Sequence, residues 1–149
     1  MSRIKLAFPL HVHFATELPV RISDINYGGH LGNDAVLSLL HEARVRFLRQ
    51  SGYTEQNIEG VGIIMADVVI VYKAEGFYGD ILNAEVTVTN IEATGCDIFY
   101  RLSKKEDGTE VAVAKTGIVF FDYEHRKPVR TPRRFGERFA LHGELGETP

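Results

Sequence analysis

A short polar segment, residues 23–34, holds the residue types that could carry out chemistry in this sequence. It reads Ser-Asp-Ile-Asn-Tyr-Gly-Gly-His-Leu-Gly-Asn-Asp and includes two carboxylates, two carboxamides, one imidazole and three glycines. A helical pattern follows at once, over residues 35–50. The N-terminus of a helix offers free backbone N–H groups and a positive dipole end. The segment therefore suits a ligand that carries a negative charge or a carbonyl group.

Three side chains of the segment are candidates for a catalytic role. The Asp24 carboxylate could act as a general base or attack a carbonyl carbon directly. His30 carries an imidazole, the group that ordinarily titrates near neutral pH, between residues that leave it exposed. The Asn26 amide could orient a water molecule. Each has a structural alternative: Asp24 holds a turn, Asn26 is a plain turn residue, and His30 bonds a backbone carbonyl.

The backbone at the start of the helix is a candidate binding site for a carbonyl oxygen. The N–H groups near Gly32 and Asn33 could polarise such an oxygen, as an oxyanion hole does. Simple capping of the helix needs the same geometry, so the two interpretations are compatible. We expect Asn33 or Asp34 to be the N-cap residue, because both types are favoured there.

The helix predicted over residues 35–50 must position this segment. Its apolar residues recur at helical spacing and cover more than one side, which predicts a central helix enclosed by other elements. Glu42 is a further catalytic candidate on this helix. The alternative is an ion pair with Arg46, four residues later. Gly52 supplies the usual helix stop.

Strand patterns surround the helix and predict an α+β fold. Pro19, within the first strand, indicates a sheet edge or a bulge. The run over 63–73 is almost entirely apolar, as expected for a strand buried on both faces. The order is β-α-β-β-β-β, and a long antiparallel sheet with one very apolar helix is expected to curl around that helix. The strands are predicted over residues 11–23, 63–73, 81–92, 97–104 and 110–123.

Length and composition indicate a single globular domain over residues 1–149 with a short helix near the end and a frayed tail over 136–149. A net charge of −3 argues against a nucleic-acid partner. The lone cysteine, Cys96, allows no disulfide within the chain, and no spacing of ligands suggests a metal site. No run is long enough to cross a membrane or to act as a signal peptide, so we expect a cytoplasmic protein.

Residues 12–135 resemble the hotdog-fold acyl-CoA thioesterases of the 4-hydroxybenzoyl-CoA thioesterase type. Residues 24–33 resemble that family's D-x-D-x-x-G-H-V-N-N loop. Glu42-Ala43-Arg44 resembles its E-A-R signature on the helix, and Tyr78-Gly79-Asp80 resembles its G-D turn before the third strand. Together these motifs are fairly specific, whereas each alone would be weak.

The resemblance implies a hotdog fold that hydrolyses an acyl thioester, with CoA or an acyl-carrier protein as the leaving group. It also implies a homodimer or homotetramer whose subunits join edge to edge, with sites at the subunit interface and no metal or redox cofactor. The phosphates of CoA could bind Lys73, Arg130 and Arg133 through charge-assisted hydrogen bonds. The alternative for the two arginines is a solvated C-terminal surface.

One position departs from the family pattern. The second acid of D-x-D, where the family usually places its catalytic carboxylate, is Asn26 here. An amide neither ionises nor usefully accepts a proton at neutral pH. The chemistry therefore moves to Asp24, His30 or Glu42, or the protein binds acyl thioesters without fast turnover. A third possibility is a hotdog dehydratase that acts on 3-hydroxyacyl thioesters.

Overall fold

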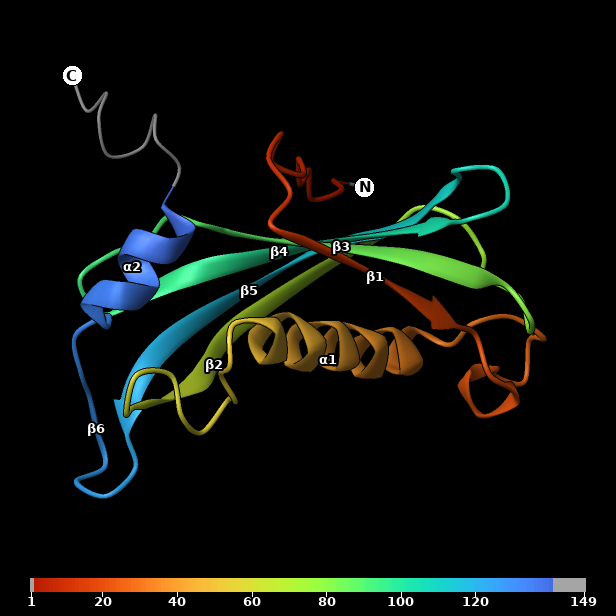
Figure 1. The fold of residues 1–149 in the computed structure, drawn as a ribbon. Coiled ribbons are helices and arrows are strands. Elements are labelled where there is room, and N and C mark those ends of the chain that lie inside the picture. The colour runs from red at the N-terminus through yellow and green to blue at the C-terminus, as the bar shows by residue number, and fades with distance from the viewer. Residues whose placement is uncertain (1, 141–149) are drawn as a thin grey trace.

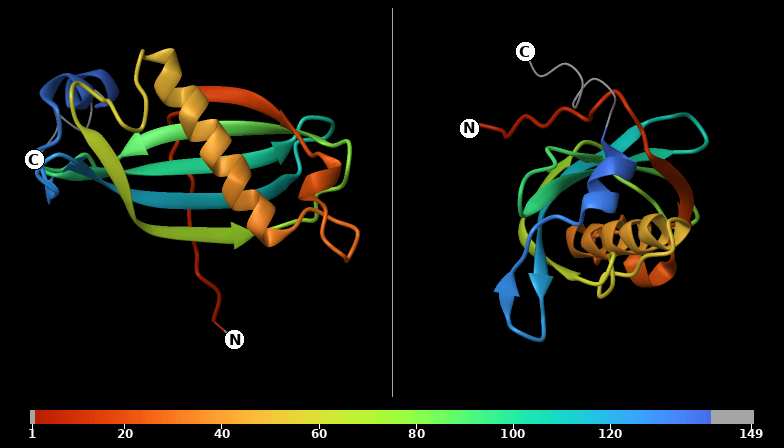
Figure 2. Two further views of the ribbon diagram at one scale, coloured as in Figure 1. Left: turned by 90° about the horizontal axis from the view of Figure 1, so that it is seen from below. Right: turned by 60° about the vertical axis from the view of Figure 1, so that its left-hand side comes forward.

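The computed structural model describes residues 2–140, and its core is an antiparallel sheet that curls around one long helix (Figure 1). The strand order is β1-β3-β4-β5-β2, and the short β6 pairs with β5. Two views along other directions show the sheet wrapping α1 (Figure 2). The elements are β1 Phe14–Pro19, the 3-10 turn η1 Ile22–Asp24, α1 Asn33–Gln50, β2 Gly62–Tyr72, β3 Ile81–Thr89, β4 Gly95–Lys104, β5 Glu110–Asp122, β6 Lys127–Pro128 and α2 Arg133–Phe139.

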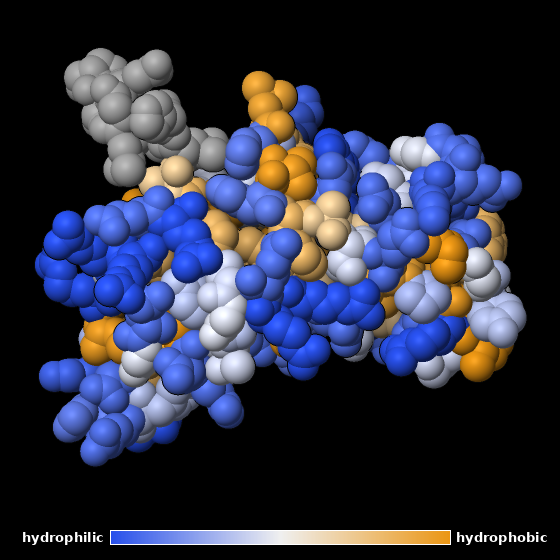
Figure 3. Space-filling view, in the orientation of Figure 1, coloured by the Kyte–Doolittle hydropathy of each residue, from blue (hydrophilic) through white to orange (hydrophobic). Residues whose placement is uncertain are grey.

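Helix α1 lies against the concave face of the sheet, as the apolar pattern predicted. Its inward side buries Val36, Leu40, Ala43 and Phe47, each at most 1% exposed. These side chains pack against the inward residues of β3, β4 and β5. The side of α1 that faces away from the sheet carries charged residues, and the surface at α1 is mainly hydrophilic (Figure 3). Burial of one broad helix face against a curled sheet is what holds the domain together.

The predicted N-cap of α1 is wrong by one position. Gly32 is the N-cap, and no side chain caps the helix. The Gly32 carbonyl accepts the first helical hydrogen bond, from the Val36 amide at 3.2 Å. Asn33 and Asp34 lie in the first turn instead, where a carboxylate complements the positive helix end. The C-terminal stop is confirmed: Gly52 adopts a φ of 78° just after the helix.

The prediction that residues 63–73 form a strand buried on both faces is wrong for the single chain. It forms β2, which lies at an edge of the sheet and pairs only with β5 among the described strands. Its central residues 65–68 are exposed, including Met65 at 40% and Val68 at 46%. A continuous apolar run cannot by itself distinguish a central strand from an apolar edge, because both lack alternation.

The two ends of the described chain differ from the predicted boundaries. The first strand is shorter than predicted, and Ile22 is 69% exposed in η1. Pro19 does lie in an edge strand, as predicted. The tail expected over 136–149 overlaps α2, whose Phe139 is 5% exposed against Phe47 and Phe135. Residues 141–149 lie outside the described part of the chain.

Candidate active site

The segment before α1 folds into a tight hairpin-like loop. Ile25 and Leu31 form an isolated antiparallel bridge. Within the loop, the backbone N–H of Asn26 donates to the backbone carbonyl of His30 at 2.9 Å. The backbone N–H of Gly29 donates to the backbone carbonyl of Asn26 at 3.0 Å. Gly29 has a φ of 84°, a conformation that side chains disfavour. The loop therefore has a defined shape that fixes His30 and Asn26.

Hydrogen bonds tie the loop to the end of β2 and the residues after it. The Leu31 amide donates to the Gly76 carbonyl at 2.7 Å. The Tyr72 hydroxyl donates to the Asn33 carbonyl at 3.2 Å. These contacts bring two segments that are far apart in sequence to the same place, at the start of α1. A cavity of about 800 Å³ lies between them, lined by Asn26, Tyr27, His30, Leu31, Asn33, Asp34, Tyr72, Lys73, Ala74 and Glu75.

Asp24 lies beside this cavity but is not among its lining residues. The residue is 5% exposed. Its carboxylate accepts the backbone N–H of Arg21 at 2.8 Å and faces the Arg21 guanidinium at 3.4 Å. Its backbone carbonyl accepts the Gly32 amide at 2.9 Å. These contacts match the structural alternative, in which Asp24 holds the loop.

Asn26 and His30 both line the cavity and lie close together. The Asn26 Oδ1 and the His30 Nε2 are each 3.3 Å from the point where a Cβ on Gly28 would stand. The Asn26 Oδ1 also accepts the Gly28 amide at 2.9 Å, as in an Asx turn. His30 Nδ1 lies 3.3 Å from the Leu31 carbonyl, and its Nε2 lies 3.4 Å from the Glu75 carboxylate. Glu75 can therefore orient the imidazole.

The backbone donors at the helix start are divided between structure and cavity. The Gly32 amide is already bonded to the Asp24 carbonyl, so it is not free to bind a ligand. Asn33 lines the cavity, and the amides of the first helical turn have no acceptor within the helix. Free backbone N–H donors were predicted at Gly32 and Asn33. In the structure they begin at Asn33, because the Gly32 N–H is already bonded.

Asp34 is a cavity residue that the sequence interpretation assigned only to capping. Its Oδ1 lies 2.7 Å from the point where a Cβ on Gly32 would stand, and the Asn26 Cβ lies 3.5 Å from the same point. The carboxylate therefore folds back over Gly32 beside Asn26, which only glycine at position 32 permits. Among residues 2–140, no hydrogen-bond or ion-pair partner holds this carboxylate. Burial of the Tyr72 phenol raises its pKa, and the nearby negative charge of Asp34 raises it further.

The signal that could have revealed Asp34 and Glu75 is weak in the sequence. Asp34 has a position typical of a helix first turn, and Glu75 stands in a connection after a strand. Only the closure of the loop onto residues 72–76 brings Glu75 to His30 and encloses Asp34 in the same cavity.

Four other predicted site residues lie apart from this cavity or at its rim. Glu42 is half-exposed on α1 and forms the predicted ion pair with Arg46, at 2.8 Å. Lys73 lines the cavity and pairs with Glu110 at 3.1 Å. Arg130 and Arg133 lie around β6 and α2, at the end of the molecule opposite the loop (Figure 1). Arg133 is 89% exposed and pairs with Glu137, so one chain does not bring Lys73 and the two arginines together.

A profile of the thioesterase-like superfamily matches residues 20–139, which include the loop, α1 and every strand of the sheet except β1. The chain belongs to this superfamily. The matched range covers most of the sequence, so the superfamily assignment and the resemblance seen in the loop agree.

Solved structures of the superfamily share the hotdog fold with this chain. A 1,4-dihydroxy-2-naphthoyl-CoA thioesterase from Synechocystis is 24% identical, with a TM-score of 0.77 over 85% of this chain and 94% of its own. A putative thioesterase from Pseudomonas aeruginosa is 18% identical, with a TM-score of 0.80 over 87% of this chain and 100% of its own. A probable thioesterase from Escherichia coli is 18% identical, with a TM-score of 0.70 over 85% of this chain and 96% of its own. A sequence search of curated proteins finds no match.

Three further observations concern residues 2–140. No group of three or more His, Cys, Asp or Glu side chains in that range is arranged to hold a metal ion. None of its helices is long and apolar enough to cross a membrane. Cys96 is buried, and burial raises the pKa of its thiol, which makes it a poor nucleophile.

Proposed function

We propose that this superfamily member hydrolyses an acyl thioester, with CoA or an acyl-carrier protein as the leaving group, in the cavity at the start of α1. The observation that supports this best is the arrangement of Asn26, His30 and Asp34 around the first free amides of a helix. A thioester needs a site that polarises its carbonyl and a group that activates water. The cavity offers a candidate for each, namely the free amides that begin at Asn33 and the carboxylate of Asp34.

The carbonyl oxygen would accept hydrogen bonds from the first-turn amides that begin at Asn33. These donors point out of the helix and carry the positive end of its dipole. They would stabilise the oxyanion that forms when the carbonyl carbon becomes tetrahedral. Asn26 would orient the attacking water from the side of the loop.

Asp34 would activate the water in place of the missing acid at position 26. Its carboxylate is in the cavity and has no partner among the described residues, whereas that of Asp24 is buried against Arg21. The water oxygen would bond to the carbonyl carbon while its proton passes to Asp34. The tetrahedral intermediate would then collapse, the C–S bond would break, and Asp34 or His30 would return a proton to the thiolate.

The site would be completed by a second subunit that joins at β2. This strand is a long, apolar and unpaired edge within the described chain, which favours pairing with another copy. In an antiparallel pairing of two β2 strands, the end near residue 62 of one lies beside the end near residue 72 of the other. Arg130 and Arg133 would then approach the partner's loop, where they could bind phosphates of CoA.

The test is release of free thiol from a panel of thioesters with short, long and aromatic acyl groups, including 1,4-dihydroxy-2-naphthoyl-CoA. Asp34→Asn should lower kcat by about 10²–10⁴-fold and leave the fold intact. Asp24→Asn is the matched control, since it makes the same change nearby in the sequence but outside the cavity. No thiol release from any member of the panel would contradict the proposal.

The thiol-release assay separates the alternative functions when binding of acyl-CoA and hydration of an enoyl-CoA are measured beside it. Binding of acyl-CoA without turnover would favour a non-catalytic thioester-binding protein, for which Asn26 is the supporting observation. Hydration of an enoyl-CoA without thiol release would favour a dehydratase. Equal rates for wild type and Asp34→Asn would leave hydrolysis in place and return water activation to Asp24 or His30.

A further inference from the structure

Arg44 is a buried cation on α1, on the same side of the helix as the candidate active site but further toward the C-terminus of the helix. The Arg44 side chain is 9% exposed. Its Nε donates to the Glu55 carboxylate at 2.6 Å, and its Nη1 donates to the Tyr100 hydroxyl at 3.0 Å. A guanidinium has five N–H groups. The other N–H groups of Arg44 have no acceptor among the described residues.

The acceptors around Arg44 are already occupied. Glu55 uses its second oxygen to bond His41 Nε2 at 2.8 Å, and Tyr100 shares a hydrogen bond with Thr116 at 2.7 Å. Burial alone would lower the pKa of Arg44, but its interactions with Tyr100 and Glu55 raise it, so the guanidinium stays charged. No buried side-chain nitrogen or oxygen in the described chain lacks a partner. The unused nitrogen of Arg44 must therefore face accessible space.

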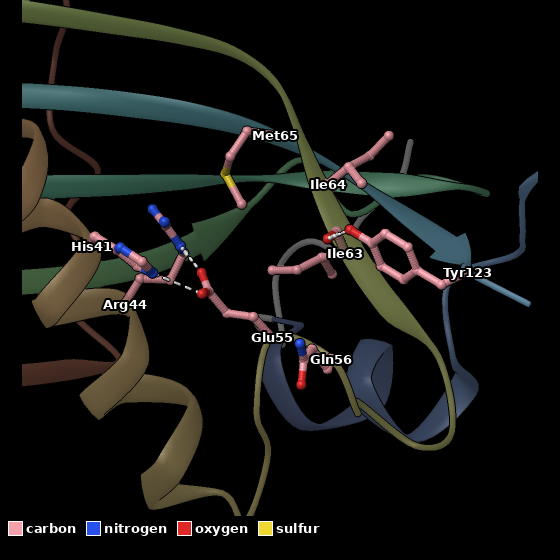
Figure 4. Close-up of a pocket in the computed structure, with 8 residues that line it drawn as sticks. All are labelled: His41, Arg44, Glu55, Gln56, Ile63, Ile64, Met65 and Tyr123. Atoms are coloured by element: carbon pink, nitrogen blue, oxygen red, sulfur yellow. Dashed lines mark hydrogen bonds and ion pairs between the residues drawn. The ribbon is translucent and has the colours of Figure 1, made fainter. Parts of the chain in front are cut away.

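That space consists of two adjoining cavities that share Arg44 and Met65. Figure 4 shows the larger, with His41, Arg44 and Glu55 on one side and β2 on the other. It has a volume of about 760 Å³ and is lined by His41, Arg44, Glu55, Gln56, Ile63, Ile64, Met65 and Tyr123. The smaller has a volume of about 320 Å³ and is lined by Leu37, Leu40, Arg44, Met65, Ala66, Asp67, Val68 and Thr116.

The cavities continue the line of the candidate active site along one side of α1. Asn33, Leu37, Leu40 and Arg44 follow one another at helical spacing, and each lines one of the cavities. At 1.5 Å per residue, the distance along the axis from Asn33 to Arg44 is about 16 Å. An extended acyl group whose carbonyl lies at Asn33 would thus pass Leu37 and Leu40 and end at Arg44.

We infer that Arg44 binds an oxygen atom at the far end of the acyl group, so that the preferred substrates are medium-length acyl thioesters with a terminal hydroxyl or oxo group. This inference rests on the proposed hydrolysis of a thioester at the start of α1. The leucines and Met65 provide an apolar wall for the chain, and the unused N–H groups of Arg44 provide the donors for its end.

A neutral oxygen fits this place better than a methyl group or a carboxylate. A methyl group would bury the unused donors without an acceptor, which is unfavourable. A carboxylate would add a second negative charge beside Glu55, which already neutralises Arg44. A hydroxyl or carbonyl oxygen satisfies the donors and leaves the pair neutral.

The experiment compares kcat/KM for dodecanoyl-CoA and ω-hydroxydodecanoyl-CoA, with butanoyl-CoA as a short reference. Wild-type protein should prefer the hydroxylated chain by about tenfold, the size expected for one charge-assisted hydrogen bond. Arg44→Met keeps the apolar stem and should abolish that preference while butanoyl-CoA turnover persists. Arg49→Met is the matched control, because it makes the same change at an exposed position of α1, and it should retain the preference.

Leu37→Trp provides a second variant if Arg44→Met fails to fold. Leu37 is 47% exposed, so the helix should tolerate the change, and the larger ring should obstruct the passage toward Arg44. Turnover of dodecanoyl groups should fall at least tenfold relative to butanoyl. Equal rates for the two dodecanoyl substrates with wild-type protein, or an unchanged length profile in Leu37→Trp, would overturn the inference. Absence of thiol release from all three would instead overturn the proposed function.

Discussion

The two aspartates of residues 23–34 differ in what their carboxylates contact, and this difference decides their expected roles. Asp24 is buried and bonded to Arg21, so its charge is already used to hold η1 and the turn that follows. Asp34 lies in the cavity over Gly32 and has no partner among the described residues. Their sequence positions show two acids near a helix start and do not reveal which one faces a substrate.

Asp24→Asn should therefore act mainly on stability. The substitution removes a carboxylate that accepts the Arg21 amide, and the free energy of unfolding should fall by about 1–2 kcal/mol. Urea unfolding would measure this, with Glu106→Gln, an exposed turn position, as the control. Turnover per folded molecule should stay within a fewfold of wild type. A large loss of kcat with unchanged stability would instead assign the chemistry to Asp24.

Element positions were predicted well where the pattern has one explanation. The period of α1, its stop at Gly52 and the turns between strands follow directly from the sequence. The role of β2 did not, because an apolar run fits a central strand and a self-associating edge equally well. Asp34 was missed because a first-turn carboxylate stabilises a helix whether or not it also faces a cavity. The sequence identified Arg44 only as part of a motif, because the Glu55 carboxylate that binds its guanidinium lies eleven residues later.

The ion pair between α1 and the segment before β2 makes stability depend on pH. Burial would raise the pKa of Glu55, but hydrogen bonds from Arg44 and His41 outweigh it and hold the pKa below its ordinary value. A lowered folded-state pKa stabilises the fold above the unfolded-state pKa, and this contribution is lost as pH falls through the folded-state value. The free energy of unfolding should therefore decline below about pH 5.

Glu55→Gln tests this link. The variant should be less stable than wild type at pH 7 by about 1–3 kcal/mol, and its stability should decline less on acidification. Guanidinium unfolding between neutral and acidic pH would measure both. Some decline should remain in the variant, since the pKa values of Asp67 and Asp122 are also lowered, by Lys115 and His125 respectively. Parallel pH profiles for the two proteins would show that Glu55 contributes nothing to the acid response.

At the scale of the whole molecule, the open edge of β2 is the feature that the single chain leaves unexplained. Strand β2 has eleven residues, with Met65, Val68 and Tyr72 exposed, and one of its sides pairs with no other strand of the described chain. Such an edge is prone to pair with another strand. The proposed dimer would cover it and bring each loop cavity beside the start of the partner's β2.

Val68→Lys should convert the proposed dimer into a monomer. Val68 lies near the middle of β2 and is 46% exposed, so the lysine can be accommodated in one chain. In an antiparallel pair, two such lysines would lie close together across the twofold axis and repel each other. Sedimentation velocity would measure the mass, with Val45→Lys, at a 37% exposed position on α1, as the control. A wild-type monomer, or a variant that remains dimeric, would show that β2 is not the interface.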